Sequence, residues 1–446
     1  MSMALGERLR EGERGAPAAV SARSSRVPLV VLIAISAIDQ ADRYLLATVF
    51  PLVKQEFHLS DGQLGTLSSA FVVVGAAGVV PFGILVDRTV RTRIVAWGIA
   101  IWSWAMILTG LAQSYVQLFA ARMFLGSAES TYGPASFSLV TDYYPVEERG
   151  RMLGLYQLGG IAGFVFLPVG GLVAGHWGWR AAFHVYAIPG FVLAVVAYRL
   201  REPARGSRDA EHHQLEDAAV GEASGFARLR SREAFTYLLR VGTVRVTLLS
   251  MGLTTFFLSG LGIWTTTFLV RYHQMTLVQA SAALSLLAVG AIAGALTGGY
   301  LGDRLVKAGH GAGRLHVAGG AQLAGVLILI PAFSTNSMPL MLVLFALGAS
   351  TLTMPNPALG AVLAEVIHPD LRGRSASVTS LTNVATAALS PLAFGLLSDA
   401  FDLRTAFLLT LPWMGLGGFL LLWRGPRHLP GDRSRMARQL AGEALL

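Results

Sequence analysis

The chain of 446 residues has no cysteine and few charged side chains. The absence of cysteine excludes disulfides, thiol catalysis and thiolate metal sites. Charged residues make up 14% of the chain and hydrophobic residues 53%, so too little polar side chain is available to cover the surface of a soluble protein. The composition therefore predicts an integral membrane protein.

Signatures of catalysis are missing as well. None of the 50 glycines belongs to a lysine-containing loop that could cradle phosphate, which argues against ATP-driven transport. No set of nucleophile, base and acid stands out, and the ten histidines form no ligand pair at helical spacing within an apolar stretch. We therefore expect no enzyme activity, no cofactor and no metal site.

Apolar stretches long enough to cross a bilayer as helices recur along the chain. They begin near Val27, Leu64, Ile94, Val116, Leu153, Ala181, Val246, Ala280, Leu315, Leu340, Ser375 and Thr405. The sequence thus predicts an all-α membrane protein with about twelve transmembrane helices.

The net charge of +9 reflects membrane topology, because the basic residues are concentrated in every second loop. The positive-inside rule then places these loops and both termini in the cytoplasm, and the basicity needs no nucleic-acid partner. The basic segments contain Arg8, Arg10, Arg14, Arg23, Arg26; Arg88, Arg91, Arg93; Arg149, Arg151; Arg304, Lys307, Arg314; and Arg372, Arg374.

A polar linker from about Glu202 to Arg232 divides the chain into two six-helix halves. The halves repeat each other, since the Arg149 to Arg151 motif is echoed from Arg372 to Arg374, and such pseudo-symmetric repeats are typical of transporters. Within the linker, Phe226 to Arg240 reads as an amphipathic helix at the headgroup level. The predicted parts are a cytoplasmic tail at 1–26, an N-terminal half at 27–201, a linker at 202–240, a C-terminal half at 241–424 and a second cytoplasmic tail at 425–446.

Three ionisable residues, Asp39, Asp42 and Arg43, interrupt the first apolar stretch, where each costs at least about 2.5 kcal/mol near the bilayer centre. If the first span rises from Val27 and the fourth descends from the opposite side, the helical rise places Asp39 and Glu129 both about 18 Å from the cytoplasmic ends. Arg43 is an i,i+4 neighbour of Asp39. Together with Arg122, these residues predict a midplane network of three acids and two arginines.

Such a network suits proton coupling, because movement of a nearby arginine can switch a buried carboxylate between its charged and neutral forms. Glu129 is the first candidate for the proton carrier, followed by Asp42, and Asp39 is a third candidate that could instead pair permanently with Arg43. The alternative is a static ion-pair network that holds the first and fourth helices together. The predicted substrate-binding residues are Arg43, Glu129, Arg122, Phe257, Trp264, Asn356, Thr382 and Asn383.

The loop Asp87-Arg88-Thr89-Val90-Arg91 resembles the signature of the major facilitator superfamily between its second and third helices, except that the family usually has glycine at Val90. The resemblance implies the major facilitator fold, with cytoplasmic gate latches in both halves. The implied gate residues are Asp87, Arg88, Arg91, Asp142, Arg149, Asp303, Arg304, Glu365 and Arg372.

Within this superfamily the chain resembles the Spinster-like lysolipid and sphingolipid transporters. The resemblance lies in Asp42-Arg43, the segment from Leu59 to Gly65, Trp102-Ser103, and Arg122 with Glu129. It implies that Asp42, Arg43 and Glu129 act in proton coupling and substrate binding.

The predicted function is proton-coupled secondary transport of an amphiphilic or lysolipid-like substrate by alternating access. We expect a monomer in the cell membrane whose partners are this substrate, protons and the lipid bilayer. The alternatives are a multidrug or small-metabolite proton antiporter and, from another class, an uncoupled lipid scramblase or a membrane sensor.

Overall fold

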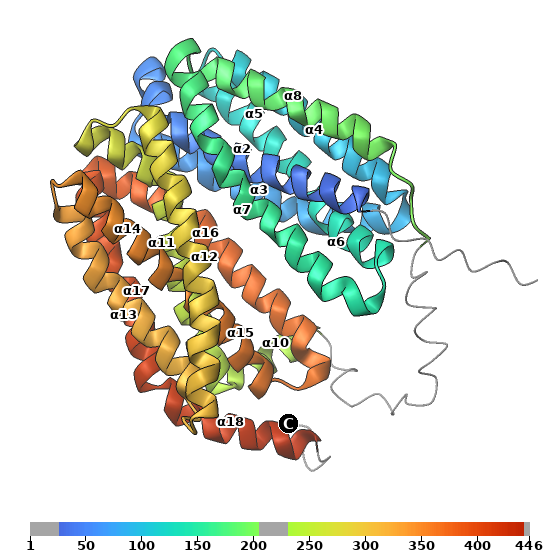
Figure 1. Ribbon diagram of the computed structural model, residues 1–446, viewed down its shortest axis with the longest axis vertical. Helices are drawn as coiled ribbons and strands as arrows, with labels where there is room; N and C mark the ends of the chain where they lie inside the picture. The colour runs from blue at the N-terminus through green and yellow to red at the C-terminus, as the bar shows by residue number, and fades with distance from the viewer. Residues whose placement is uncertain (1–25, 205–230, 441–446) are drawn as a thin grey trace, which may run out of the picture.

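The computed structural model describes residues 26–204 and 231–440, and the described chain is almost entirely helical. Figure 1 shows two bundles, which we call the N-half and the C-half. The N-half consists of α2 (Val27–Phe57), α3 (Asp61–Arg88), α4 (Arg91–Leu111), α5 (Tyr115–Glu129), α6 (Tyr132–Tyr143), α7 (Val146–Trp177) and α8 (Trp179–Tyr198). The C-half consists of α11 (Gly242–His273), α12 (Leu277–Lys307), α13 (Gly313–Ser334), α14 (Met338–Thr353), α15 (Pro355–Val366), the 3₁₀ turn η1 (Pro369–Leu371), α16 (Arg372–Ala400) and α17 (Leu403–Trp423).

Two further helices flank the C-half. The first, α10 (Ser231–Arg240), covers the end of the predicted amphipathic segment, whose residues 226–230 lie outside the described part of the chain. The second, α18 (Gly425–Leu440), forms where the sequence predicted a tail.

Ten helical segments of the described chain are long and apolar enough to cross a bilayer. The other two of the twelve predicted spans are α2, which is 31 residues long, and the pair α5–α6, whose members have only 15 and 12 residues. These two spans carry the five predicted network residues. The ionisable residues that distinguish these two spans from the other ten also lower their mean hydropathy.

The fourth and tenth spans are each broken in the middle. Proline lacks an N–H and clashes with the carbonyl four residues earlier, so Pro134 disrupts the helix at Ser130 and Pro357 disrupts it at Thr353. The breaks follow this rule, because α5 ends at Glu129 and α14 ends at Thr353. Each span was predicted to be continuous, although Pro134 and Pro357 indicate a break in the sequence itself.

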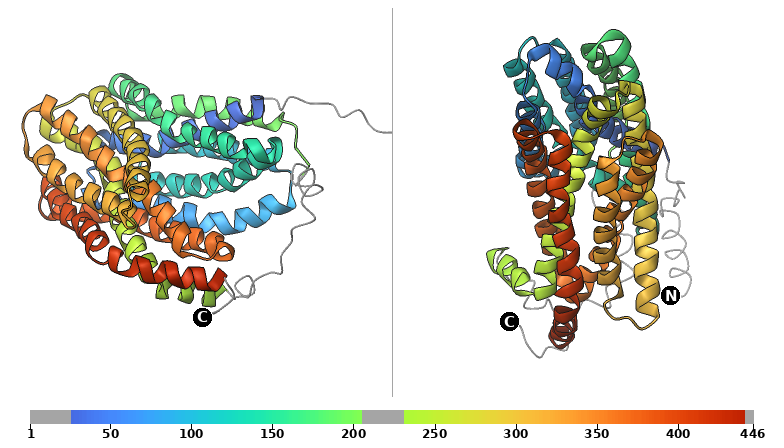
Figure 2. Two further views of the ribbon diagram at one scale, coloured as in Figure 1. Left: turned by 60° about the horizontal axis from the view of Figure 1, so that its bottom comes forward. Right: turned by 90° about the vertical axis from the view of Figure 1, so that its left-hand side faces the viewer.

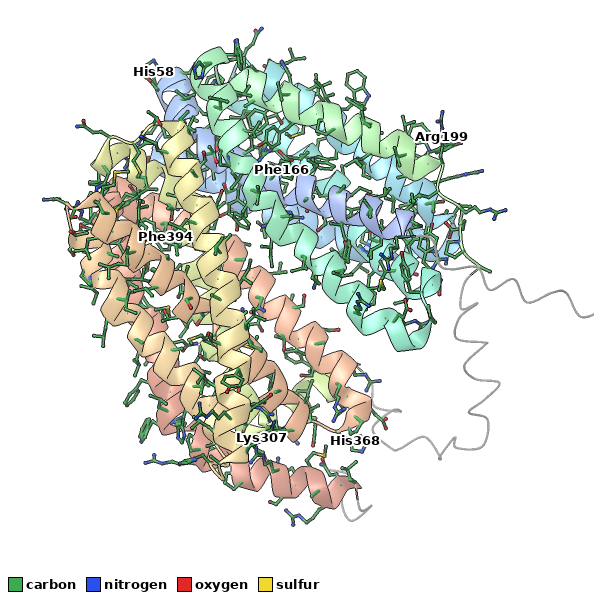
Figure 3. All side chains as sticks on the ribbon, viewed as in Figure 1. His58, Phe166, Arg199, Lys307, His368 and Phe394 are labelled. Atoms are coloured by element: carbon green, nitrogen blue, oxygen red, sulfur yellow. The ribbon has the colours of Figure 1, made fainter. Side chains whose placement is uncertain are left out.

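The two ends of the bundle differ, and we name them after residues that lie there. The Asp61 face carries the α2–α3, α7–α8 and α11–α12 connections, and the Arg91 face carries the basic loops. The halves meet at the Asp61 face, where the carboxylate of Asp399 accepts hydrogen bonds from the backbone N–H groups of Asp61 at 2.8 Å and Gly62 at 2.7 Å. In Figure 3, Arg199 of the N-half lies at the right of the view and Lys307 and His368 of the C-half at the bottom, so the halves splay apart toward the Arg91 face.

Candidate functional site

The break in the fourth span places Glu129 at the last residue of α5, inside the N-half. Two glycines on neighbouring helices make room for the break. A Cβ atom on Gly78 would lie 2.2 Å from the hydroxyl of Ser130, and one on Gly98 would lie 2.0 Å from that of Thr131. The local packing therefore requires glycine on both neighbours if Glu129 is to sit at a helix end.

Arg43 lies between two buried carboxylates. Its Nε donates to Asp39 at 3.1 Å, and its Nη2 lies 2.8 Å from Glu129. The hydroxyl of Tyr132 also donates to Asp39. Both acids are buried, whereas the Arg43 side chain is 39% exposed, so the arginine connects the buried acids to open space.

Asp42 belongs to a second group, and its side chain is fully buried. It accepts a hydrogen bond of 2.8 Å from the indole N–H of Trp102, and Arg122 Nη1 lies 3.8 Å from its other oxygen. The sequence placed Asp42 beside Arg43, but α2 turns the two side chains to different neighbours. The five predicted network residues thus lie together as two adjoining groups, one reaching open space through Arg43 and one buried.

Arg122 is almost completely buried, and its Nε and Nη1 atoms have no hydrogen-bond partner among the described residues. Its guanidinium lies 5.5 Å from the ring centroid of Phe71 and 5.6 Å from that of Phe183. The aromatic rings contribute a cation–π attraction, which partly offsets the burial of the charge.

A cavity of about 410 Å³ lies between the halves beside these residues. Arg43 and Arg122 are the only charged groups among its lining residues, and Gln40, Ser68 and Asn383 add polar groups. A second cavity of about 370 Å³ shares Gln40 with the first but is lined mainly by apolar side chains. Its apolar lining residues are Ile161, Phe164, Leu258, Leu261, Leu284, Leu287, Ala288, Ala291, Ile292, Ala295 and Ala349.

The first cavity continues toward the Arg91 face. A groove of about 520 Å³ shares Asn383 and Val384 with it and runs along α16 to Arg372. A further space of about 250 Å³ brings Glu129 to the same opening through shared Arg43 and Phe71. The central space is therefore accessible from the Arg91 face.

The structure places only part of the predicted C-half lining in this space. Asn383 lines the first cavity, and Asn356 lines the second. Thr382 lies instead in a groove between α10, α11 and α16. Thr382 is not among the lining residues of the central cavity, because it precedes Asn383 by one residue and its side chain therefore points about 100° away around α16.

Phe257 and Trp264 are also excluded from the cavity, since both are fully buried. Phe257 packs against Phe394 and Phe407, and the Trp264 indole donates to the carbonyl of Pro391 at 3.1 Å. The cavity face of α11 is formed by Thr255, Leu258, Ser259 and Ile263. Because α11 is apolar on most of its surface, its sequence gave no signal for which face turns inward.

Arg91, a predicted gate residue of the N-half, is buried at the start of α4. Arg91 forms an ion pair with Asp142 and another, at 2.8 Å, with Glu202. Nearby, Arg149 donates to the carbonyl of Thr141 at 2.9 Å. Arg88 is exposed, and the side chain of Asp87 lies outside what the structure describes.

Glu202 is an addition that the sequence analysis did not assign. Although partial burial acts in the opposite direction, hydrogen bonds from Arg91 and the backbone N–H of Thr92 hold the pKa of Glu202 below its ordinary value.

The C-half has a related cluster with different members. Arg314 pairs with both Asp303 and Glu365, and Arg433 of α18 pairs with the other oxygen of Glu365. The predicted Arg304 is exposed, and Arg372 donates to the carbonyl of Ala364 at 3.2 Å, so neither is paired with the predicted acids.

The repeat in the sequence indicates Arg314, which was not among the predicted gate residues. Arg314 follows Arg91 by 223 residues, the same separation that relates Asp142 to Glu365. The repeat does not indicate Arg433 or Glu202. Each residue follows the last spanning helix of its half, but one is a base and the other an acid.

The Asp61 face carries a cluster that the sequence analysis did not assign. Arg271 of α11 donates two hydrogen bonds to Asp61, at 2.8 and 2.9 Å. Lys54 and the hydroxyl of Ser398 contact the same carboxylate. Asp61 is buried, so one acid holds together groups from both halves. Across the described residues, no cluster of three or more histidine, aspartate or glutamate side chains could hold a metal ion.

The chain matches the family model of the Major Facilitator Superfamily over residues 32–383 and 311–442. It belongs to the major facilitator superfamily. The predicted fold is thereby confirmed, and its relatives are transporters rather than enzymes.

The relatives include sugar-acid transporters and Spinster-type transporters. A probable galactarate/D-glucarate transporter, GarP of Escherichia coli, is 25% identical over 403 residues, which cover 83% of this chain and 87% of GarP. A probable sphingolipid transporter, spinster homolog 1 of Arabidopsis thaliana, is 25% identical over 370 residues, covering 78% of this chain and 74% of that protein. The predicted similarity to the Spinster proteins is confirmed alongside a similarity to sugar-acid transporters.

The fold is also similar to a solved structure. A bacterial homolog of the human lysosomal transporter Spinster, in an inward-facing and occupied conformation, superposes with a TM-score of 0.79 and 22% sequence identity. The match covers 91% of this chain and 97% of that one.

Proposed function

We propose that this transporter is proton-coupled and moves an amphiphilic anion by alternating access. The Arg91 face would be cytoplasmic, as the basic loops predict, with both termini on that side of the cell membrane. The conformation described above would then be the inward-open state of a monomer. The observation that carries the proposal is the position of Arg43, which is paired to buried Glu129 and Asp39 yet exposed in the cavity.

Charge balance supports proton coupling. The three acids and two arginines of the network carry a formal charge of −1 when all five are ionised. Uptake of one proton makes the network neutral, which removes a net repulsion toward an anion in a region of low dielectric. Glu129 is the proposed carrier, because it borders the space that opens to the Arg91 face, whereas Asp42 is sealed between Trp102 and Arg122.

Substrate and proton would bind together through Arg43. While Glu129 is ionised, it occupies one side of the Arg43 guanidinium at 2.8 Å. Protonation of Glu129 weakens that pair and frees donors of Arg43 for an anionic headgroup, to which charge-assisted hydrogen bonds are strong. Arg43 then keeps its pair with Asp39, and the cost of leaving its Nη2 side without an anion couples the two binding events.

The apolar second cavity supports an amphiphile. Because it adjoins the arginine-lined cavity through Gln40 and Tyr44, a headgroup at Arg43 leaves room for an acyl chain beyond Tyr44. Burying that chain contributes about 0.8 kcal/mol for each CH₂ group.

Transport by the purified full chain in proteoliposomes tests the proposal. A fluorescent lysophospholipid should be taken up faster when a pH gradient is imposed, and Glu129→Gln should abolish the response to the gradient. Glu148→Gln, which removes an exposed acid at the Arg91 face, is the matched control and should respond as the wild type does. Gradient-driven uptake that persists in Glu129→Gln would rule out Glu129 as the carrier, and flux indifferent to the gradient in the wild type would indicate an uncoupled scramblase.

A small organic anion is the second candidate substrate. It is supported by the sugar-acid transporter among the relatives and by the polar groups of Gln40, Ser68 and Asn383 around the first cavity. Galactarate added to the same assay separates the two candidates. Gradient-driven galactarate uptake without lysophospholipid uptake would favour the small anion and leave proton coupling intact.

A further inference from the structure

The C-terminal helix α18 crosses the Arg91-face ends of the C-half helices, as Figures 1 and 2 show. One stripe of this helix is buried. Its buried residues are Gly425, Leu429, Asp432, Met436 and Gln439. Their spacing of three and four residues puts them on a single helical face, which packs against the bundle.

Three polar contacts fix the orientation of α18. Asp432 accepts a hydrogen bond of 2.7 Å from the backbone N–H of Thr243 at the start of α11. Gln439 accepts one of 2.9 Å from the hydroxyl of Tyr237 in α10, and Arg433 pairs with Glu365 of α15. Each contact joins α18 to a different helix, so the outer surface of α18 is held in a defined position.

That outer surface carries four exposed arginines, Arg424, Arg427, Arg435 and Arg438, which we call the arginine flank. At 100° per residue they fall within a sector about 80° wide, whose centre lies about 120° around the helix from the centre of the buried stripe. The only acid of α18, Asp432, is buried on that stripe. Within residues 26–204 and 231–440, no acidic side chain lies within ion-pair distance of the flank.

The arginine flank begins where the lipid-facing surface of the protein ends. On α17, Trp413, Phe419 and Trp423 are exposed large side chains along the outside of the bundle. The guanidinium groups of Arg424 and Arg427 lie 5.3 and 5.1 Å from the ring centroid of Trp423. Tryptophan at the end of a spanning helix is typical of the membrane interface, so Arg424 and Arg427, which begin the flank, lie at the depth of the lipid phosphates.

We propose that the arginine flank is a binding surface for anionic phospholipid headgroups of the protein's own bilayer. Arginine binds phosphate through paired N–H donors, and a basic cluster next to a spanning helix is attracted to anionic lipid over about one Debye length. The apolar belt of α17 directly beside the flank favours a lipid over a soluble polyanion. Because α18 also holds Glu365, a bound headgroup stabilises the Arg91-face end of the C-half. The inference is independent of which substrate is transported.

Thermal unfolding of the purified full chain in detergent tests this surface. Added phosphatidylglycerol should raise the unfolding midpoint by about 5 °C, and phosphatidylcholine should not. The triple variant Arg427→Gln, Arg435→Gln, Arg438→Gln should lose more than half of that rise. A higher salt concentration should reduce the rise in the wild type, because salt screens the attraction.

Two controls keep the result interpretable. The triple variant Arg151→Gln, Arg199→Gln, Arg201→Gln removes the same charge from exposed positions at the Arg91 face of the N-half and should keep the wild-type rise. Replacing Arg427, Arg435 and Arg438 with lysine preserves their charge and should retain most of the rise. An unchanged rise in the glutamine variant of the flank would overturn the proposal, as would an equal rise with phosphatidylcholine.

Discussion

The two ends of the molecule use ion pairs differently. At the Asp61 face, Arg271 of the C-half donates to Asp61 of the N-half, so the ion pair crosses between halves. At the Arg91 face, Arg91 pairs with Asp142 and Glu202 within the N-half, and Arg314 pairs with Glu365 within the C-half. Ion pairs of similar chemistry therefore close one end of the bundle and only tie neighbouring helices together at the other.

Backbone packing follows the same division. A Cβ atom on Gly65 would lie 2.3 Å from the carbonyl oxygen of Pro391, and one on Gly395 would lie 2.4 Å from that of Asp61. The α3 and α16 backbones thus approach as closely as glycine allows at the Asp61 face. By contrast, Gly150 at the start of α7 and Gly373 at the start of α16, both at the Arg91 face, have no described atom near a Cβ position.

The largest effect is expected from Asp61→Asn. The substitution removes the charge that holds Arg271, Lys54 and Ser398 together, and breaking a buried pair costs about 3 kcal/mol or more. Because the contacts with Arg271 and Ser398 exist only in the conformation closed at the Asp61 face, the population should shift toward opening there, by up to about a hundredfold. Spin labels on Gln55→Cys and Phe401→Cys, in a chain without native cysteine, should report a longer distance.

The matched control for this experiment is Glu56→Gln. Glu56 lies at the same face and pairs with Arg180 at 2.6 Å, but both residues belong to the N-half. We expect it to leave the distance distribution unchanged. If Asp61→Asn also left the distribution unchanged, the ion pair between halves would have no part in closing this face.

Gly65→Ala should have a smaller effect in the same direction. The added methyl group meets the Pro391 carbonyl and the Cα atom of Leu392, which are backbone atoms and cannot rotate away. Overpacking of this kind costs about 1–3 kcal/mol, again only while the Asp61 face is closed.

Gly83→Ala on the same helix is the control for Gly65→Ala. No atom lies within 4 Å of its Cβ position, so it should leave the distance between the labels unchanged and gain up to about 1 kcal/mol of helix propensity. An equal distance change in both variants would mean that the close approach of α3 and α16 does not control opening.

The sequence predicted the features that depend on spacing along one helix or on the repeat. Asp39 and Arg43 are paired because residues four apart share a helical face. Glu129 was placed at the depth of Asp39, one turn from Arg43, and it meets Arg43 there. The repeat related Asp142 to Glu365, and both acids are paired with arginines.

Other features could not be predicted from one sequence. Asp61 and Arg271 are 210 residues apart, at the start of α3 and the end of α11, and only the packing of the halves brings them together. Phe257 and Thr382 were assigned to the wrong helical face, because helices surrounded by lipid and protein have apolar residues on every side. Arg433 was assigned to a tail, since Pro430 and the polar composition of 425–440 gave no sign of a docked helix.

The smallest effect is expected at the Arg91 face, from Glu202→Gln. Glu202 accepts hydrogen bonds from Arg91 and from the backbone N–H of Thr92, but it is partly exposed, so loss of its charge should cost about 1 kcal/mol of unfolding free energy. The lowered pKa of Glu202 sets the pH dependence. Its contribution is fully present above the unfolded-state pKa of about 4.3 and is lost as the pH falls through the lower folded-state value.

The difference in unfolding midpoint between wild type and Glu202→Gln should therefore be constant near pH 7 and shrink below about pH 4. The label distance at the Asp61 face should not change, because the pair joins Glu202 and Arg91 within one half. A shift in that distance would show that the two faces are coupled through the N-half, and that ion pairs confined to one half also set the balance between conformations.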